Sequence, residues 1–239
     1  RRSSAASDVY KRQVFNSEGK VENDASIMKG NDLNAGASSG TSNVKNPITL
    51  AANIMNHSEH VFLSGKGAEN FAKNRNLEIV NNEYFHTKFR YNQLLNKKGE
   101  DKYGTVGCVA IDVNGNIVAG TSTGGMTNKK WGRIGDSPII GAGTYANNST
   151  CGISSTGSGE YFIRTVAAYQ VSSLLENHNY DLKKAMYKVI HEKIGGIGGD
   201  GGMIGIDKNS NISMEFNTPG MYRAYVNKNG EKEILLYQK

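Results

Sequence analysis

The sequence has little of what builds disulfide-rich, membrane-spanning or metal-binding proteins. It holds 2 cysteines in 239 residues, too few for a disulfide framework. No apolar run approaches the roughly 20 residues that a membrane-spanning helix needs. The 5 histidines are scattered, and no spacing of cysteine and histidine resembles a metal site. We therefore predict no membrane association and no bound metal, in a chain whose composition is typical of a globular protein.

The net charge of +6 is a hint of nucleic-acid binding that its distribution does not support. Residues 1–13 carry four basic side chains and one acidic side chain, which supplies half of the total. The other half is spread over the rest of the chain, without a basic helix or an alternation of basic and aromatic residues. We predict no nucleic-acid partner.

Two apolar stretches joined by an Asn-Gly turn predict a β-hairpin in the middle of the chain. They cover residues 104–112 and 117–125, and the turn is Asn114–Gly115. Cys108 alternates with apolar neighbours in the first stretch, so we expect its thiol to be buried.

Thr105 begins that first stretch, directly after Gly104. A threonine hydroxyl within a chain has no base beside it, but cleavage of the preceding peptide bond would give Thr105 a free α-amine. That amine titrates at about 7.7–8.0 and would act as a base for the neighbouring hydroxyl. The simpler interpretation is a β-branched residue at the start of a strand.

Two other groups of residues suit the binding of a charged substrate. Thr156 and Gly157 open a run of small residues at a predicted helix start, where backbone N–H groups suit an oxyanion; the alternative is an ordinary helix cap. Arg133 and Asp136 stand three apart in a loop and could hold an α-carboxylate and an α-ammonium group; the alternative is a surface ion pair.

The order of the predicted elements indicates an α+β fold. Strands come as hairpins, and helices come in consecutive runs, including one predicted from about residue 161 to residue 176 and one capped by Asp181. This order favours antiparallel sheets covered by helices in layers over a doubly wound parallel sheet.

From about residue 14 to residue 237 the sequence resembles the isoaspartyl peptidase/plant-type L-asparaginase family of N-terminal nucleophile hydrolases. The resemblance is carried by several runs in the order that the family has them. These runs are 104–107 (GTVG), 121–129 (TSTGGMTNK), 132–138 (GRIGDSP), 141–146 (GAGTYA), 156–160 (TGSGE), 198–202 (GGDGG) and 216–223 (FNTPGMYR).

The resemblance implies an αββα four-layer sandwich and an amidohydrolase that cleaves β-aspartyl (isoaspartyl) dipeptides and L-asparagine. It also implies self-cleavage between Gly104 and Thr105, no cofactor, and a homodimer of cleaved pairs. Residues 14–104 would then be the α-subunit portion and residues 105–239 the β-subunit of one domain.

The resemblance also assigns roles to single residues. Thr105 would be the nucleophile that forms a β-aspartyl acyl-enzyme, and Thr123 would hydrogen-bond its hydroxyl. Thr156 and Gly157 would form the oxyanion hole and line the substrate pocket.

The aspartyl group of the substrate would be held by a second set of residues. Arg133 would bind its α-carboxylate, Asp136 its α-amine, and Gly159 would line that pocket.

The sequence is compatible with two alternative functions. Glycosylasparaginases share the implied fold and nucleophile, but they usually have asparagine in place of Gly125 and more cysteines. The other alternative is an inactive, unprocessed remnant. It arises because residues 1–13 read as a foreign or disordered lead where the family has a His-Gly-Gly-Ala-Gly-like run.

We therefore expect an N-terminally truncated family member. It would lack a core strand, a sodium-binding loop and an asparagine near the nucleophile. Cytoplasmic and periplasmic localisation both stay open.

Overall fold

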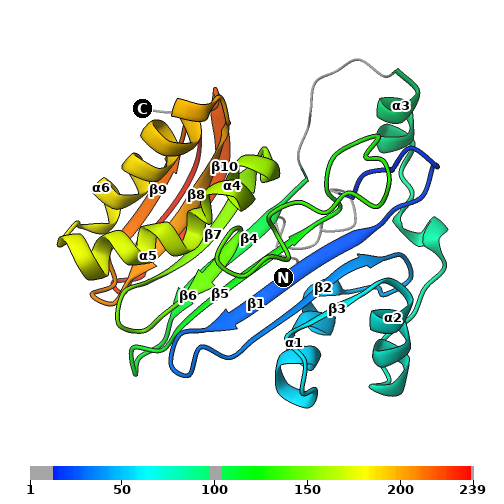
Figure 1. The fold of residues 1–239 in the computed structure, drawn as a ribbon, viewed down its shortest axis with the longest axis horizontal. Helices are drawn as coiled ribbons and strands as arrows, with labels where there is room; N and C mark the ends of the chain where they lie inside the picture. The colour runs from blue at the N-terminus through cyan, green and yellow to red at the C-terminus, as the bar shows by residue number, and fades with distance from the viewer. Residues whose placement is uncertain (1–12, 97–103, 238–239) are drawn as a thin grey trace.

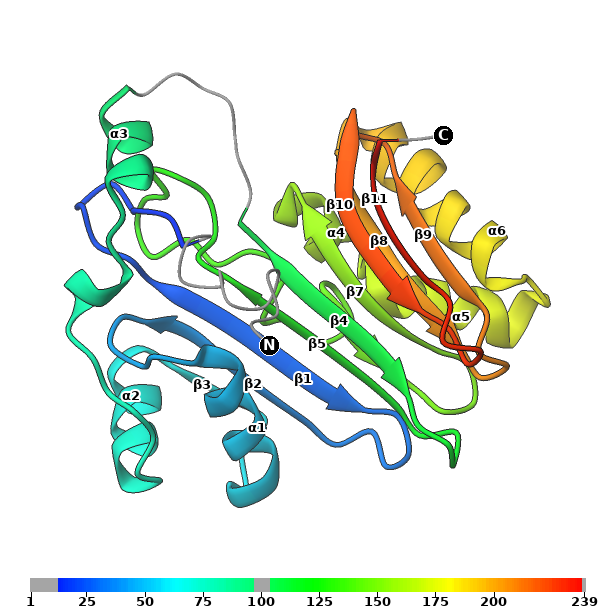
Figure 2. The same ribbon diagram turned by 180° about the vertical axis from the view of Figure 1, so that it is seen from behind.

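The structure, a computed structural model, describes residues 13–96 and 104–237 and has the predicted α+β class. Two sheets pack face to face, and helices cover the outer face of each (Figures 1 and 2). The predicted αββα order of layers is therefore confirmed. The helices of the two outer layers are α1 (Pro47–His57) and α2 (Gly65–Asn74) on one side, and α5 (Ala167–His178) and α6 (Leu182–Tyr187) on the other.

The first sheet contains the predicted hairpin, in the order β3-β2-β1-β5-β4 among the described residues. In the antiparallel hairpin Val106 lies opposite Ser122. On the other side of β5, Asp24 lies opposite Thr123. The strands of the first sheet are β1 (Asn23–Lys29), β2 (Ala35–Thr41), β3 (Phe62–Ser64), β4 (Val106–Ile111) and β5 (Ile117–Thr123).

The second sheet is antiparallel, in the order β6-β7-β8-β9, and a separate hairpin of β10 and β11 follows it. Within the second sheet β8 and β9 pair as an antiparallel hairpin. The strands of the second sheet and of the separate hairpin are β6 (Thr144–Ala146), β7 (Cys151–Gly157), β8 (Gly201–Asp207), β9 (Ile212–Phe216), β10 (Gly220–Val226) and β11 (Lys232–Tyr237).

The helix predicted over residues 161–176 is wrong in one respect, because two helices cover that stretch. These are α4 (Gly159–Thr165) and α5, separated by Val166, which adopts a left-handed conformation (φ 49°, ψ 48°) that cannot continue a helix. The Asp181 cap is confirmed, since its carboxylate accepts a 2.7 Å hydrogen bond from the backbone N–H of Lys184. The remaining helical segments are α3 (Lys88–Asn96), η2 (Asn82–Phe85), η3 (Lys188–Ile194) and η4 (Gly195–Ile197).

Apolar side chains fill each of the three spaces between the layers. Val171 and Met186 belong to the cluster under α5 and α6. Ile117 and Ala119 belong to the cluster between the two sheets. Leu50 and Ile54 belong to the cluster under α1 and α2. Burial on both faces of the sheets therefore holds the four layers together.

The prediction that Cys108 is buried is wrong, because its thiol is exposed. β4 is an edge strand of its sheet, and this part of it lines a groove of about 850 Å³. Strands β10 and β11 form the other side of the groove, including Ala224 and Ile234. Val109, the next residue, packs against the cluster between the two sheets, so alternation along β4 places Cys108 on the opposite, uncovered face of the strand.

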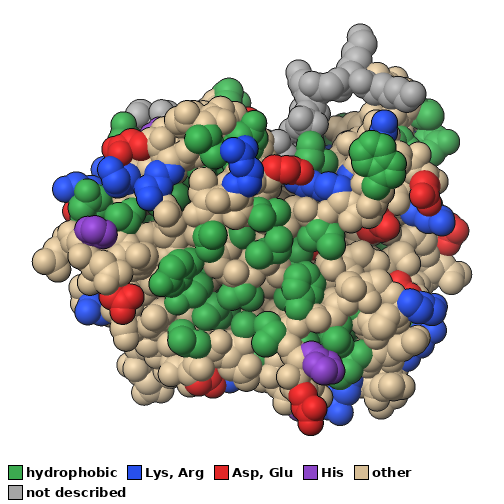
Figure 3. Space-filling view, viewed as in Figure 1, with side chains coloured by type: hydrophobic (Ala, Val, Ile, Leu, Met, Phe, Trp, Pro, Cys, Tyr) green, Lys and Arg blue, Asp and Glu red, His purple; other side chains and the backbone are tan. Residues whose placement is uncertain are grey.

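Apolar side chains also gather on the surface seen from the direction of Figure 1. On the face seen in Figure 3, hydrophobic side chains lie across the middle and charged side chains lie mostly toward the edge. Among the described residues, no helix combines the length and the apolar character needed to cross a bilayer.

Candidate active site

Thr105 and Thr123 lie side by side at one end of the first sheet. Because Val106 pairs with Ser122, the residue before β4 falls next to the last residue of β5. The hydroxyl of Thr105 donates a 3.3 Å hydrogen bond to the hydroxyl of Thr123. The hydroxyl of Thr123 also accepts a 2.9 Å bond from the backbone N–H of Gly125. The contact between the two threonines that the resemblance implies is therefore present.

The second sheet approaches this end of the first sheet closely. A Cβ atom on Gly107 of β4 would lie 2.0 Å from the hydroxyl oxygen of Ser154 on β7, so the backbone packs where only glycine fits. Thr105 lies two residues before Gly107 along the chain, and Thr156 lies two residues after Ser154. Figure 2 shows the start of β4 and the end of β7 at the same end of the sandwich. Thr105 and Thr156 therefore come to the same end of the molecule from two different sheets.

Gly157 closes β7 in a conformation that other residues rarely adopt, with φ +148°. A Cβ atom there would lie 2.4 Å from the carbonyl oxygen of Asp200. The next residue, Ser158, is tied to Asp200 as well: its backbone N–H donates a 2.9 Å bond to the Asp200 carbonyl, and its hydroxyl donates to the Asp200 carboxylate. These contacts fix the turn between β7 and α4.

Arg133, Asp136 and Gly159 come together beside that turn. A Cβ atom on Gly159 would lie 2.8 Å from the backbone nitrogen of Asp136 and 3.0 Å from Nη2 of Arg133. The Asp136 side chain is buried, and its Oδ2 has no hydrogen-bond partner among the described residues. A buried carboxylate oxygen without a donor is well suited to accept a hydrogen bond from the ammonium group of a ligand.

Burial raises the pKa of Asp136 to about 7, and the positive charge of Arg133 lowers it by a smaller amount. The opposite shift occurs in Glu160, where the hydrogen bond from Arg133 lowers the pKa of the carboxyl group. The pKa of Asp136 thus lies near neutral pH, whereas Glu160 stays ionised at that pH.

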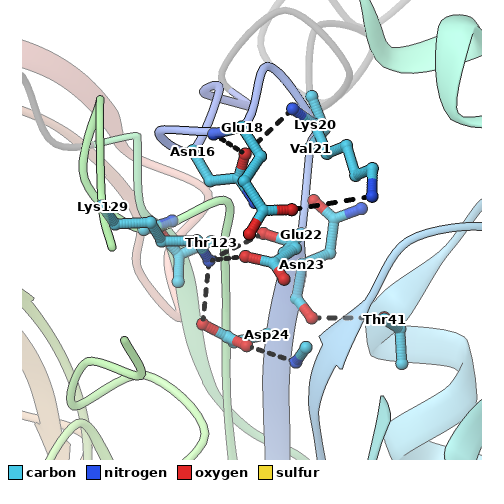
Figure 4. A network of polar contacts seen from close by, with 12 residues as sticks. Asn16, Glu18, Lys20, Val21, Glu22, Asn23, Asp24, Thr41, Thr123 and Lys129 are labelled. Carbon is cyan, nitrogen blue, oxygen red and sulfur yellow. Dashed lines mark hydrogen bonds and ion pairs between the residues drawn. The ribbon is translucent and has the colours of Figure 1, made fainter. Parts of the chain in front are cut away.

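A charged group beside Thr123 was not predicted from the sequence. Figure 4 shows Lys129 reaching from the loop after β5 toward Glu22, which directly precedes β1, and toward Asp24, the second residue of β1. Lys129 Nζ donates a 3.1 Å bond to the Glu22 carbonyl and lies 3.8 Å from Glu22 Oε2 and 4.0 Å from Asp24 Oδ2. The side chains of Lys129 and Asp24 are only 2% and 1% exposed.

Burial raises the pKa of Asp24, and Lys129 opposes that shift. The carboxylate also accepts a 2.8 Å bond from the backbone N–H of Gly40. No local signal in the sequence marks this group, because Lys129 and Asp24 are far apart along the chain and meet only in the folded structure. Within residues 13–96 and 104–237, no cluster of three or more His, Cys, Asp or Glu side chains could hold a metal ion.

Comparison with known proteins relates this arrangement to a family. A sequence model of the family described as "Asparaginase" matches residues 6–236. The isoaspartyl peptidase of Escherichia coli (strain K12) is 47% identical over 227 residues, which cover 89% of this chain and 71% of that protein.

Two further relatives come from eukaryotes. A putative isoaspartyl peptidase/L-asparaginase of Dictyostelium discoideum is 45% identical over 90% of this chain and 74% of its own length. A probable isoaspartyl peptidase/L-asparaginase 2 of Arabidopsis thaliana is 37% identical over 92% of this chain and 77% of its own length. Together with the αββα sandwich, these matches show that the chain belongs to the asparaginase family of N-terminal nucleophile hydrolases.

Proposed function

We propose that this protein is an amidohydrolase that cleaves β-aspartyl dipeptides and L-asparagine with Thr105 as its nucleophile. The observation that carries the proposal is the convergence of two groups of residues. The paired hydroxyls of Thr105 and Thr123 lie at the same end of the sandwich as the site of Arg133 and Asp136. The names of the curated relatives support the same activity.

The proposed active form arises by cleavage of the bond between Gly104 and Thr105. Residues 14–104 then form the α-subunit portion and residues 105–239 the β-subunit. Cleavage gives Thr105 a free α-amine, which can accept a proton near neutral pH. The resemblance to the family further supports a homodimer of the cleaved pair.

The proposed reaction needs no group beyond the chain and water. Thr105 Oγ1 attacks the side-chain carbonyl carbon of the aspartyl group, and the α-amine of Thr105 takes the hydroxyl proton. Thr156 and Gly157 stabilise the oxyanion, an interaction in which the loss of one donor costs about 10²–10³ in rate. The protonated amine then gives its proton to the departing ammonia or amine.

A β-aspartyl ester on Thr105 is left by that first step. Water attacks the ester carbonyl while the α-amine of Thr105 takes its proton, and the amine returns that proton to Thr105 Oγ1 as the ester bond breaks and L-aspartate departs. The α-carboxylate and α-ammonium groups that bind Arg133 and Asp136 are common to asparagine and to β-aspartyl dipeptides. The site therefore accepts either leaving group.

The test is a turnover assay with a β-aspartyl dipeptide, L-asparagine and N-acetylglucosaminyl-asparagine in parallel. We expect release of L-aspartate from the first two substrates and none from Thr105→Ala. Preferential turnover of the sugar-linked substrate would favour glycosylasparaginase activity. The absence of turnover from a processed chain would refute the proposal.

A further inference from the structure

The guanidinium group of Arg133 is already engaged by a neighbouring carboxylate. Arg133 Nε and Nη2 donate to Glu160 Oε1 and Oε2, and both distances are 2.8 Å. The Arg133 side chain is 18% exposed and the Glu160 side chain is 53% exposed. Two parallel hydrogen bonds between planar groups fix the orientation of a guanidinium group more tightly than a single contact does.

Glu160 leaves part of the guanidinium group available to a ligand. An arginine side chain has five N–H donors, and Glu160 uses one on Nε and one on Nη2. The remaining donors lie on Nη1 and on the outer side of Nη2. This outer edge can bind a second carboxylate through two hydrogen bonds.

Two glycines limit the other orientations of Arg133. A Cβ atom on Gly135 would lie 2.8 Å from Nη1, and one on Gly159 would lie 3.0 Å from Nη2. The guanidinium group therefore packs directly against backbone at two positions. Glu160 follows Gly159 in α4, so the ion pair joins the loop that carries Arg133 to the segment that carries the pocket.

We propose that Glu160 is a positioning residue, which holds Arg133 so that its outer edge binds the α-carboxylate of the substrate. This inference rests on the proposed function, because Arg133 must bind that carboxylate. Glu160 contacts the arginine and not the reacting carbonyl. Its loss should therefore weaken substrate binding and leave the chemical step almost unchanged.

The experiment compares the steady-state kinetics of Glu160→Gln and Glu160→Asp with those of the wild type. With a β-aspartyl dipeptide we expect Glu160→Gln to raise KM about tenfold, the effect of losing one charge-assisted contact. We expect kcat to change by less than about twofold, and Glu160→Asp to recover part of the affinity. The matched control is Glu192→Gln, which removes another half-exposed ion pair, with Lys188, at 2.7 Å.

A substrate without an α-carboxylate separates positioning from a general effect on the fold. β-Alaninamide keeps the amine and the amide but offers Arg133 nothing to bind. Wild type and Glu160→Gln should therefore hydrolyse it equally slowly. An unchanged KM for the dipeptide would overturn the proposal, and so would a lower KM, which would mean that Glu160 competes with the substrate.

The failure of this proposal can be told apart from the failure of the proposed function. If the wild type does not hydrolyse β-aspartyl dipeptides, the function itself is wrong. Calorimetric titration with L-aspartate then still tests Glu160, because binding needs no turnover. Equal affinity of the wild type and Glu160→Gln for L-aspartate would refute the positioning role, and no binding to either protein would refute the assignment of Arg133.

Discussion

At the scale of single residues, Asp136 makes substrate binding depend on pH. Its pKa of about 7 means that the free site holds a growing fraction of neutral carboxyl groups as the pH falls below 7. Only the carboxylate can pair with an α-ammonium group. We therefore expect the affinity for L-aspartate to fall about tenfold between pH 8 and pH 6. Calorimetry at both values tests this, and Asp136→Asn should bind weakly without the pH dependence.

Gly159 shows how little space the pocket has. A methyl group there would lie 2.8 Å from Asp136 Oδ1 and 3.0 Å from Arg133 Nη2, so Gly159→Ala must displace both groups. We expect KM to rise at least tenfold while the protein stays folded. The control is Gly196→Ala, because a Cβ atom at Gly196 meets nothing within 4 Å. Equal kinetics for the two variants would contradict the placement of the pocket.

The sequence was most informative about residues whose chemistry is unusual. Thr105 and Thr123 meet as predicted, and Arg133, Asp136 and Gly159 adjoin one another. The ion pair of Lys129 and Asp24 was not predicted, because a buried pair of this kind depends on strand register, which a single sequence does not show. The same limit explains why Cys108 was wrongly predicted to be buried. Alternation shows which residues share a face of a strand, but it does not show which of the two faces is covered.

At the scale of elements, Lys129 joins the loop after β5 to the start of β1. Lys129→Met would leave Asp24 as a buried carboxylate without its cation. Removal of one partner of a buried pair costs about 3–5 kcal/mol. Urea unfolding should show a loss of this order, whereas Lys130→Met, which changes an exposed neighbour, should change stability by less than about 0.5 kcal/mol. Equal stability of both variants would rule out this role for Lys129.

The break between α4 and α5 offers a stabilising substitution. Val166 is a β-branched residue with φ 49°, a conformation that costs an L-residue about 1–2 kcal/mol. Its side chain is 45% exposed, so little packing is lost on removal. Val166→Gly should therefore stabilise the protein by about 1 kcal/mol, which calorimetry would detect as a rise in Tm of about 2–4 °C. A lower Tm would show that the side chain contributes more than the strain costs.

This break also marks what the sequence could not predict about elements. The helical character of residues 161–176 was predicted correctly although its division was not, and Asp181 indicated the next helix start. Nothing in the local sequence marks Val166 as left-handed, because valine disfavours that conformation. Tertiary packing imposes it: the backbone N–H groups of Ala168 and Tyr169 donate to the carbonyls of Ala142 and Gly141.

At the scale of the whole molecule, the sandwich brings distant parts of the chain to one site. The two sheets carry Thr105 and Thr156 on separate strands, and the loop between β5 and β6 carries Arg133 and Asp136. The order of hairpins and helices was enough to predict the class of fold. The αββα arrangement came from the resemblance, since periodicity alone does not say how two sheets stack.

Self-cleavage at Gly104–Thr105 is the step on which the whole account depends. The most direct test is the intact mass of the purified chain of 25.9 kDa before and after long incubation at neutral pH, beside Thr105→Ala. We predict two fragments that meet between Gly104 and Thr105 in the wild type, and one uncut chain in the variant. A wild-type chain that stays whole, just as Thr105→Ala does, would contradict Thr105 as an activated N-terminal nucleophile.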